Sequence, residues 1–367
     1  MIPAVGAEAS GGPREHPSVL LQEVLAWLDL KPGLFVVDAT VGPGGHARAM
    51  LERILPGGQL LALDRDPEAL ALAHQRLDPF GSAVEIVHSS FARLPLLLAE
   101  RGRRGADRIL LDLGLSLPQI TSPRFSFHLD APLDFRLDPA LPYTAADYLA
   151  RLSEKELARV LWELGEERWA GRIARAIVRQ RQRAPITTTQ QLVHLVESSV
   201  PRAHWPRRRH VATRTFQAFR LLVNQELEAL DQFLEALPEV LLPGGRVAIL
   251  SYHSLEDRRV KRAFRALAGL EGQTGPGVPP TASLILLTRR AVRPSAAEIA
   301  ANPRARSARL RVAARPVEAT TGSARSWEGP ACSAGPANPE EGGLVSPALP
   351  PAIPGGWVQA GGGPCWR

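Results

Sequence analysis

Seven short apolar runs, each ending in or near a polar residue, alternate with helical patterns along this chain. Runs of this length and character are typical of strands that are buried on both faces. Helices are predicted between the first four runs, over 45–55, 67–77 and 91–101. Asp66 is the expected N-cap of the helix over 67–77, and Pro67 lies in its first turn. The predicted strands are Leu34–Asp38, Gln59–Asp64, Val84–His88, Arg108–Asp112, Gly245–Ser251, Ser283–Thr288 and Arg309–Ala313. Such alternation predicts an α/β fold with a doubly wound, mostly parallel sheet.

The alternation stops after the fourth predicted strand. Residues 117–216 contain no good strand pattern but several helical ones. These helical patterns cover Glu154–Leu164, Glu167–Arg183 and Thr188–Ser198. We therefore predict an all-helical insertion over 117–216, set into a sheet domain formed by 16–116 and 217–315.

Both ends of the chain lie outside the pattern. Residues 1–15 lack the features of a signal peptide and are predicted to be a flexible N-terminus. Residues 316–367 contain 19 Gly or Pro, a density typical of low-complexity sequence, and are predicted to be a disordered tail. Since no apolar run reaches the ~18–20 residues of a membrane span, we expect a cytoplasmic protein that does not bind membranes.

A glycine-rich loop follows the first predicted strand, in the segment from Asp38 to His46. The second strand ends at Asp64, where a carboxylate can accept both ribose hydroxyls of an adenosine. Phe91 follows the third strand and could stack on an adenine, and the fourth strand ends at Asp112. Because the carboxyl ends of parallel strands share one edge of a sheet, these residues are predicted to form one ligand site.

The spacing within the loop favours one cofactor over another. A dinucleotide site would show Gly-x-Gly-x-x-Gly, whereas this loop has Asp-x-x-x-Gly-x-Gly-Gly and Pro43 lacks an N–H for a pyrophosphate. Asp38 and Asp64 would repel phosphates but tolerate a sulfonium ligand that also carries an ammonium group. The predicted cofactor is therefore S-adenosylmethionine.

Many further segments of the chain resemble the bacterial MraW/RsmH family, whose members methylate N4 of a cytosine in the decoding region of 16S ribosomal RNA. The resemblance covers roughly residues 16–315. It rests above all on Gly44-Gly45-His46, Leu61–Pro67, Leu110–Gly114, Ala212–Gln217, Ser251–Arg258 and Asn302–Ser307. It implies a Rossmann-like methyltransferase sheet, S-adenosylmethionine as cofactor, and the small ribosomal subunit with its 16S RNA as partner.

Residue by residue, the family implies cofactor contacts at seven positions. These are Gly44, Gly45, His46, Asp64, Phe91, Asp112 and Gln119. The sequence departs from the usual family pattern at Pro43, commonly arginine, and at Leu117, commonly serine. Ala131, Phe135 and Leu137 also replace a usual glycine and two usual methionines.

The sequence also limits the atom that receives the methyl group. Methylation of carbon 5 of a pyrimidine usually requires a cysteine thiolate, but both cysteines, Cys332 and Cys365, lie in the tail. Nitrogen or oxygen is therefore the expected acceptor. Asp112 is a candidate to accept a hydrogen from the base amine, although a contact to the cofactor alone explains it equally well.

The segment after the fifth strand offers further candidates for the site. Tyr252 and His253 are candidate base contacts, and Ser254 is expected to cap a helix that starts at Leu255. His46 has no second ligand at metal-binding spacing, so no metal is predicted.

Basic residues in the insertion point to a polyanionic partner. The chain has 44 Lys+Arg against 37 Asp+Glu and a pI near 10.2. Arginines at helical spacing and a later cluster are predicted to contact RNA phosphates. They are Arg168, Arg172, Arg175, Arg179, Arg207, Arg208 and Arg209. Phe125, Phe127 or Phe135 could stack on the unstacked base, or they could pack the junction between insertion and sheet.

Two other functions compete with an RNA methyltransferase. A nicotinamide-dependent dehydrogenase is disfavoured by the glycine spacing. An RNA-binding assembly factor without turnover is disfavoured by the complete series of Asp38, Asp64 and Asp112. The sequence leaves the oligomeric state open, a homodimer included.

Overall fold

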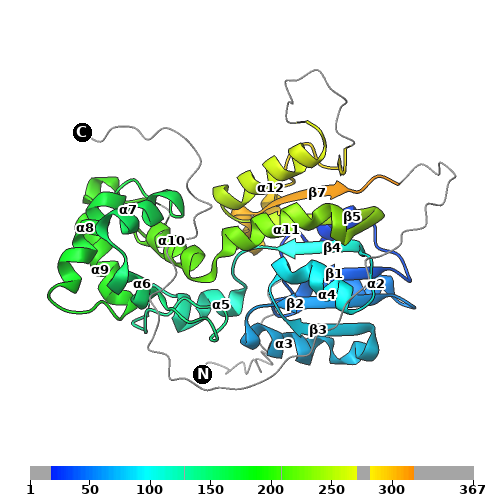
Figure 1. Cartoon of the computed structure of the whole chain (residues 1–367), viewed down its shortest axis with the longest axis horizontal. Coiled ribbons are helices and arrows are strands. Elements are labelled where there is room, and N and C mark those ends of the chain that lie inside the picture. Colours follow the sequence, from blue (N-terminus) through cyan, green and yellow to red (C-terminus); the bar gives the residue numbers. More distant parts are fainter. Residues whose placement is uncertain (1–17, 128, 208, 271–281, 318–367) are drawn as a thin grey trace, which may run out of the picture. The chain divides into compact units, whose positions relative to one another are not determined.

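The computed structural model describes residues 18–127, 129–207, 209–270 and 282–317. They contain a seven-stranded sheet in the order β3-β2-β1-β4-β5-β7-β6 (Figure 1). Neighbours among β1 to β5 pair in parallel, whereas β7 pairs antiparallel with both β5 and β6. The strands are β1 (Phe35–Asp38), β2 (Gln59–Asp64), β3 (Val84–His88), β4 (Ala106–Asp112), β5 (Leu241–Ser251), β6 (Ile285–Leu286) and β7 (Arg309–Ala314). The predicted mostly parallel sheet is confirmed.

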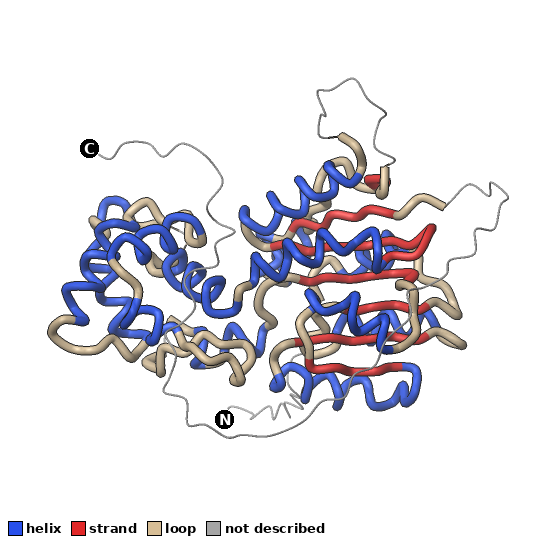
Figure 2. The backbone as a smooth tube through the Cα atoms, viewed as in Figure 1, coloured by secondary structure: helices blue, strands red, loops and turns tan. Residues whose placement is uncertain are grey.

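Helices cover both faces of the sheet, as the strand sequences require (Figures 1 and 2). Alternate strand residues enter different cores: Val37 packs in one, and its neighbour Val36 packs in the other. The first core includes side chains of α4 (Leu94–Glu100), α11 (Glu226–Val240) and α12 (Ser254–Leu267). The second includes side chains of α1 (Leu21–Leu28), α2 (Gly45–Ile54) and α3 (Pro67–Leu77). The sheet is therefore doubly wound.

The strand order reverses between β1 and β4. The chain builds β1, β2 and β3 outward in one direction and then returns to place β4 on the other side of β1. Connections on the two sides of such a switch point leave on opposite faces, which opens a crevice at the carboxyl ends of the strands. The loops that follow β1 and β4 border this crevice.

Local sequence signals set the start of α3. The Asp66 carboxylate accepts a hydrogen bond from the Glu68 amide at 3.0 Å, and Pro67 occupies the first turn. The predicted helix over 67–77 is confirmed, cap included. The helix predicted over 91–101 is divided instead: the 3₁₀ turn η2 (Phe91–Arg93) precedes α4. Ser90 caps that turn by accepting from the Ala92 amide, so the first three residues form a turn of their own.

Residues 117–216 are helical where they are regular. The helices are α5 (Leu117–Thr121), α6 (Ala145–Arg151), α7 (Glu154–Glu163), α8 (Ala170–Arg181), α9 (Thr189–Ser199) and α10 (Thr213–Asn224). Helix α7 packs on α8 and α10, and α8 packs on α9. Helix α10 runs through the predicted domain boundary at residue 216.

Short 3₁₀ turns and one further helix complete the described elements. They are η1 (Asp78–Ala83), η3 (Pro123–Phe125), η4 (Arg202–His204), α13 (Ala296–Ala301) and η5 (Pro303–Ser307). Among the helices of the described residues, none is long and apolar enough to cross a membrane.

Several predicted boundaries are wrong: β4 starts at Ala106 and β5 at Leu241, before the predicted Arg108 and Gly245. The strand predicted over 283–288 pairs only at Ile285 and Leu286, because the Leu287 and Thr288 amides both turn to the Val312 carbonyl. The helix predicted over 167–183 starts at Ala170, because the Glu167 carboxylate accepts from the Trp169 amide and closes a separate turn. The predicted flexible N-terminus and disordered tail lie almost wholly outside the described residues.

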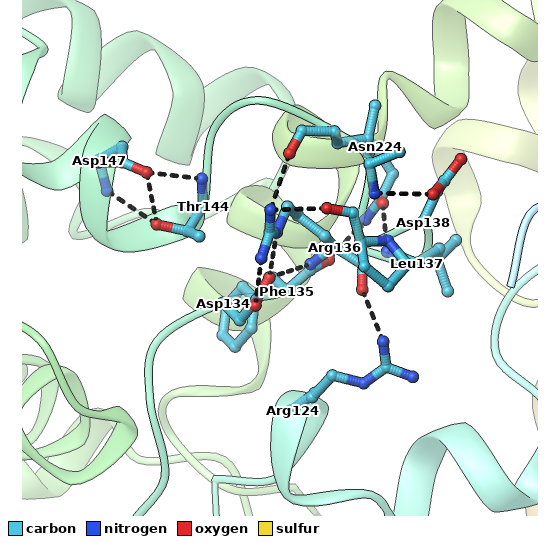
Figure 3. A network of polar contacts seen from close by, with 12 residues as sticks. Arg124, Asp134, Phe135, Arg136, Leu137, Asp138, Thr144, Asp147 and Asn224 are labelled. Carbon is cyan, nitrogen blue, oxygen red and sulfur yellow. Dashed lines mark hydrogen bonds and ion pairs between the residues drawn. The ribbon is translucent and has the colours of Figure 1, made fainter. Parts of the chain in front are cut away.

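Asn224, at the end of α10, contacts the 135–137 loop (Figure 3) and the residue that follows β2. Its fully buried side chain donates to the Phe135 carbonyl at 2.7 Å and accepts from the Leu137 amide at 2.7 Å. Its own carbonyl accepts from Arg65, which follows β2, at 2.6 Å. One side chain thus fixes the 135–137 loop, where Phe135 has a φ of +67°.

Replacing Asn224 by Ala is expected to lower the free energy of unfolding by about 2–6 kcal/mol, because two buried backbone groups lose partners at ~1–3 kcal/mol each. Urea unfolding followed by circular dichroism measures this change. Gln182→Ala, which removes an exposed amide at the end of α8, is the control. A stability of Asn224→Ala equal to that of the control would contradict the role assigned to Asn224.

Candidate functional site

A cavity of about 1010 Å³ lies at the carboxyl ends of the parallel strands. Thr40 after β1, Asp64 at the end of β2, Asp112 at the end of β4 and Tyr252 after β5 all line it. Six of the seven residues predicted to contact the cofactor line this cavity: Gly45, His46, Asp64, Phe91, Asp112 and Gln119. The predicted convergence of strand ends at one edge is confirmed.

The loop between β1 and α2 depends on its glycines. Gly42 has a φ of +51°, and its amide donates to Asp64 Oδ2 at 2.8 Å. Gly44 has a φ of +84°, and a Cβ there would meet the Leu77 side chain at 3.4 Å. Gly44 therefore shapes the turn and packs against α3, and it is the one predicted cofactor contact that does not line the cavity. A Cβ on Gly45 would overlap the Ser18 hydroxyl.

Asp64 is fixed by backbone amides. Its Oδ2 accepts from Gly42, and its Oδ1 accepts from Asp66 at 2.9 Å. Burial raises the pKa of Asp64 above its ordinary value, and these hydrogen bonds oppose that effect. Each carboxylate oxygen keeps a second lone pair, so Asp64 can still accept the hydroxyls of a ribose.

Gln119 is fixed as firmly as Asp64. Its Nε2 donates to Asp66 Oδ2 at 2.8 Å, and its Oε1 accepts from the Ser116 amide at 2.8 Å. The second bond closes a capping box at the start of α5. Gln119 therefore connects the start of α5 to the start of α3, across the cavity edge.

Asp38, the last residue of β1, is 1% exposed. Its Oδ1 accepts from the Thr40 amide at 3.3 Å, but its Oδ2 has no hydrogen-bond partner within the described part of the chain. Burial, with a smaller contribution from the charges of Asp112 and Asp64, raises the pKa of Asp38 to about 8, although the hydrogen bond from Thr40 acts in the opposite direction. Asp64 and Asp112 line the cavity, and the buried Asp38 interacts electrostatically with both, so the three acids together favour a ligand that carries positive charge.

Asp112 makes three polar contacts at the end of β4. Its Oδ1 accepts from the Tyr252 hydroxyl at 2.8 Å, and its backbone amide donates to Thr40 Oγ1 at 2.6 Å. Its Oδ2 lies 3.5 Å from His46 Nδ1. Burial raises the pKa of Asp112 to about 7, although the hydrogen bond from Tyr252 acts in the opposite direction.

His46 can share a proton with Asp112. Its Nε2 lies 3.1 Å from the Val19 carbonyl, which only accepts, so Nε2 carries a hydrogen. Burial lowers the pKa of His46 to about 4, so the ring is neutral and its Nδ1 lone pair faces Asp112. A proton bound to Asp112 Oδ2 would lie between two acceptors.

The start of α12 differs from the prediction. Its N-cap is His253, whose Nδ1 accepts from the Glu256 amide at 3.4 Å, so the predicted cap at Ser254 is wrong. Ser254 lies in the first turn, and its hydroxyl donates to Glu166. His253 Nε2 lies 3.0 Å from Glu256 Oε1, so both ring nitrogens face Glu256. A contact from His253 to the base remains a prediction.

Sequence reasoning missed Glu256. This residue is 2% exposed, and its carboxylate accepts from the Tyr252 amide at 2.8 Å. Although burial acts to raise it, the hydrogen bond from His253 and the positive charge of Arg220 hold the pKa of Glu256 below its ordinary value. Glu256 therefore orients the Tyr252 backbone. The sequence signal for this role is the position of Glu256 three residues after His253, the spacing of a capping box at the start of a helix.

The three phenylalanines considered for base stacking all line the cavity. Phe125 stacks on Phe135 with ring centres 6.4 Å apart, and Phe135 packs on Phe216 at 5.0 Å. Both rings are buried, whereas Phe127, stacked on His210 at 4.9 Å, is partly exposed. These contacts show a packing role, and stacking on a base remains a prediction.

The predicted RNA-binding arginines lie in two places. Arg168, Arg172, Arg175 and Arg179 are exposed and do not line the cavity. Of these, Arg175 lies 3.5 Å from Glu154, and the Arg172 guanidinium lies over the Trp169 ring. Arg207 and Arg209 are exposed, and Arg209 lines the cavity. Arg208 lies outside the described residues.

Comparison with known proteins assigns the chain to a family. The sequence model of the MraW methylase family matches residues 13–316. The chain belongs to this family. Family membership confirms the predicted cofactor, S-adenosylmethionine, and excludes a nicotinamide-dependent dehydrogenase.

Curated relatives agree over nearly their whole length. Three proteins named ribosomal RNA small subunit methyltransferase H are similar to this chain. That of Citrifermentans bemidjiense is 48% identical over 81% of this chain and 97% of its own. The protein of Syntrophotalea carbinolica is 49% identical over 82% of this chain and 98% of its own length. The protein of Halorhodospira halophila is 51% identical over 82% of this chain and 94% of its own length. Among solved structures, TrmN from Thermus thermophilus is 18% identical over 81% of this chain and 48% of its own, with a TM-score of 0.37.

The residues around the cavity fit the family cofactor. The unpartnered Oδ2 of Asp38 and the acids Asp64 and Asp112 suit a ligand with a sulfonium and an ammonium group. Pro43 and Leu117, which depart from the usual family pattern, both line the cavity. Within the described residues, no group of three or more His, Cys, Asp or Glu side chains could hold a metal ion.

Asp38→Asn is expected to change the pH dependence of stability in the free protein. A carboxyl with a pKa of 3.8 when unfolded and about 8 when folded binds more protons in the folded state between these values. Its contribution to stability is therefore lost as the pH rises from about 4 to 8. The Tm of Asp38→Asn minus that of the wild type should increase from pH 5 to pH 8, as measured by scanning calorimetry.

The exposed Asp130→Asn serves as the matched control, since it removes the same charge from the surface. An Asp38→Asn difference in Tm that is the same at both pH values would contradict the assigned titration of Asp38.

Proposed function

We propose that this chain transfers a methyl group from S-adenosylmethionine to the N4 amine of a cytosine in the decoding region of 16S ribosomal RNA. The names of its relatives support ribosomal RNA of the small subunit as substrate. The observation that carries the chemistry is Asp112, held by the Tyr252 hydroxyl in a cavity that three phenylalanines also line. The cavity volume of about 1010 Å³ lies at the top of the ~300–1,000 Å³ range of ligand pockets, which leaves room for both a cofactor and a base.

The residues present favour an amine as the methyl acceptor. Carbon 5 of a pyrimidine is usually activated by a thiolate, but residues 1–331 contain no cysteine. An exocyclic amine needs no covalent activation, only a group that accepts one of its hydrogens. Asp112 supplies such a group at the edge of the sheet where the cofactor residues gather.

The chain has two tasks once donor and base are bound. When bound, S-adenosylmethionine supplies a methyl group on a positively charged sulfur. The walls of the cavity orient the amine toward that methyl, and such positioning can contribute ~7–11 kcal/mol to lowering the barrier. Asp64, Phe91 and Gln119 would hold the adenosyl part, while Asp38 and the glycine loop would border the cationic part.

Asp112 handles the proton. As the N4–methyl bond forms, the amine nitrogen carries one hydrogen too many, and the Asp112 carboxylate accepts it. Tyr252 occupies Oδ1, which leaves Oδ2 as the accepting oxygen. The Nδ1 lone pair of His46, 3.5 Å from Oδ2, stabilises the proton there. Tyr252 and His46 act through Asp112 and are positioning residues, whereas Asp112 is the catalytic residue.

The insertion would recognise the RNA. Arg209 lines the cavity and is exposed, so it can contact a phosphate beside the target nucleotide. The exposed arginines around α8 extend the basic surface away from the cavity. A cytosine must be unstacked before it can enter, as other base-modifying enzymes require.

Incubation of the protein with small ribosomal subunits, or with naked 16S RNA, and isotopically labelled S-adenosylmethionine should yield labelled N4-methylcytidine at one position. Nucleoside mass spectrometry after nuclease mapping identifies the product. A labelled ring carbon would refute the proposed acceptor atom, and RNA binding without any transfer would instead indicate an assembly factor.

Asp112→Asn should lower the single-turnover rate by about 10²–10⁴-fold, the range for loss of an acid–base group. The wild-type rate should rise with pH as Asp112 loses its proton, at a pH below the value of about 7 that burial gives the free protein because the bound cofactor is cationic, and this dependence should vanish in Asp112→Asn. Tyr252→Phe removes the hydrogen bond that lowers the pKa of Asp112, so the rise of the rate should move to higher pH in this variant. Quenched-flow rates between pH 5 and pH 9 test both variants.

Cofactor affinity, measured by calorimetry, is the control for these variants. If Asp112→Asn loses affinity for S-adenosylmethionine but keeps the wild-type rate at saturation, Asp112 is a cofactor contact only.

A further inference from the structure

A segment near the end of the described chain also borders the cavity. Strand β7 runs antiparallel to β5, so Arg309 at its start pairs with Ser251 at the carboxyl end of β5. The residues that precede β7 must therefore lie at the edge of the sheet where the cavity opens. Asn302 and Arg304, among others of this segment, line the cavity.

This segment is firmly attached. In η5 and just after it, Ala305 is 0% exposed and Ala308 is 1% exposed. The buried Asn302 side chain accepts from the Arg304 amide at 3.3 Å. Glu298, in α13, accepts from the Leu20 amide at 2.7 Å and so joins the segment to α1. The side chains that it exposes are held on a fixed backbone.

Three exposed arginines on this segment line the cavity: Arg293, Arg304 and Arg306. Within the described residues, none of the three lies within ion-pair distance of a carboxylate. Neighbouring arginines of the cavity behave differently, since Arg309 pairs with Asp257 at 2.6 Å and Arg220 pairs with Glu226 at 2.8 Å. The three arginines therefore leave positive charge uncompensated at the rim.

We propose that Arg293, Arg304 and Arg306, here called the rim arginines, bind backbone phosphates of the RNA next to the target nucleotide. This inference rests on the proposed function. Arg209 presents a further exposed cation at the same cavity from the insertion. A single strand that delivers its base into the cavity carries a phosphate on each side of that base. Arginines from two separate elements of the rim can contact those phosphates, which fixes the register of the strand without reading its sequence.

The position of the site favours phosphates over the carboxylate of the cofactor. The planar N–H donors of arginine match phosphate and carboxylate oxygens alike, but the exposure of all three side chains suits a ligand that lies along the rim. Cofactor binding is assigned instead to the strand ends and the glycine loop.

The test compares Arg304→Ala/Arg306→Ala with the matched pair Arg53→Ala/Arg104→Ala. Both control arginines are exposed and do not line the cavity: Arg53 lies in the last turn of α2, and Arg104 lies between α4 and β4. Binding of a single-stranded 16S RNA fragment is measured by fluorescence anisotropy at several salt concentrations. The rim variant should bind more weakly, and the slope of log K against log[salt] should fall by about 1.4, at ~0.7 per lost phosphate contact. The control pair should keep the wild-type slope.

Kinetics provide a second measurement. The KM for RNA should rise in Arg304→Ala/Arg306→Ala, whereas kcat and the affinity for S-adenosylmethionine should match the wild type. Arg304→Glu/Arg306→Glu should weaken RNA binding further, because it adds repulsion.

Two results would overturn the inference: a salt slope of the rim variant equal to that of the control pair, or a loss confined to cofactor affinity. If the wild-type protein neither binds nor methylates the RNA, the proposed function itself is refuted. If the wild-type protein is active but the rim variant behaves like the control pair, only the inference about the rim arginines is refuted.

Discussion

Parallel pairing of β1 with both β2 and β4 is the constraint on which the site depends. It brings Asp38, Asp64 and Asp112, which are far apart in the sequence, to one edge of the sheet. Burial at that edge raises the pKa of each carboxyl group. A fold with these strands antiparallel would send every second strand end to the opposite edge and would separate the acids.

The cavity combines two opposite electrostatic environments. The partly buried Asp64 and Asp112 line it, next to the buried Asp38, and the charge of these acids is costly in the free protein; a cationic ligand removes that cost. The rim of the cavity carries exposed arginines from the insertion and from the segment before β7. A small cation and a large polyanion can therefore bind the same cavity at different depths without competing for the same groups.

Much of this arrangement could be predicted from the sequence, because its signals are local. The buried run of β2, the short partly exposed run of the edge strand β3 and the Asp66-Pro67 start of α3 are such signals, and the structure places them where they were predicted. The divided helix at 91–101 and the late start of α8 came from local side-chain bonds to the backbone, at Ser90 and Glu167, whereas other wrong predictions depended on distant contacts. The cap of α12 moved to His253 because Ser254 bonds to Glu166. The short β6 reflects pairing to β7, which no local pattern could reveal. The rim arginines were missed because only the antiparallel return of β7 brings them to the cavity.

The hydrogen bond from the Leu20 amide to Glu298 joins residues 278 positions apart. Val19, the neighbour of Leu20, holds His46 in place, and β7 covers the edge of β5. During synthesis on the ribosome, β1 to β5 can pair before the residues that form the Leu20–Glu298 hydrogen bond and the β5–β7 pairing are all available. The pocket is therefore among the last parts of the protein to be completed, and a chain released before β7 would keep most of its core but have no finished active site.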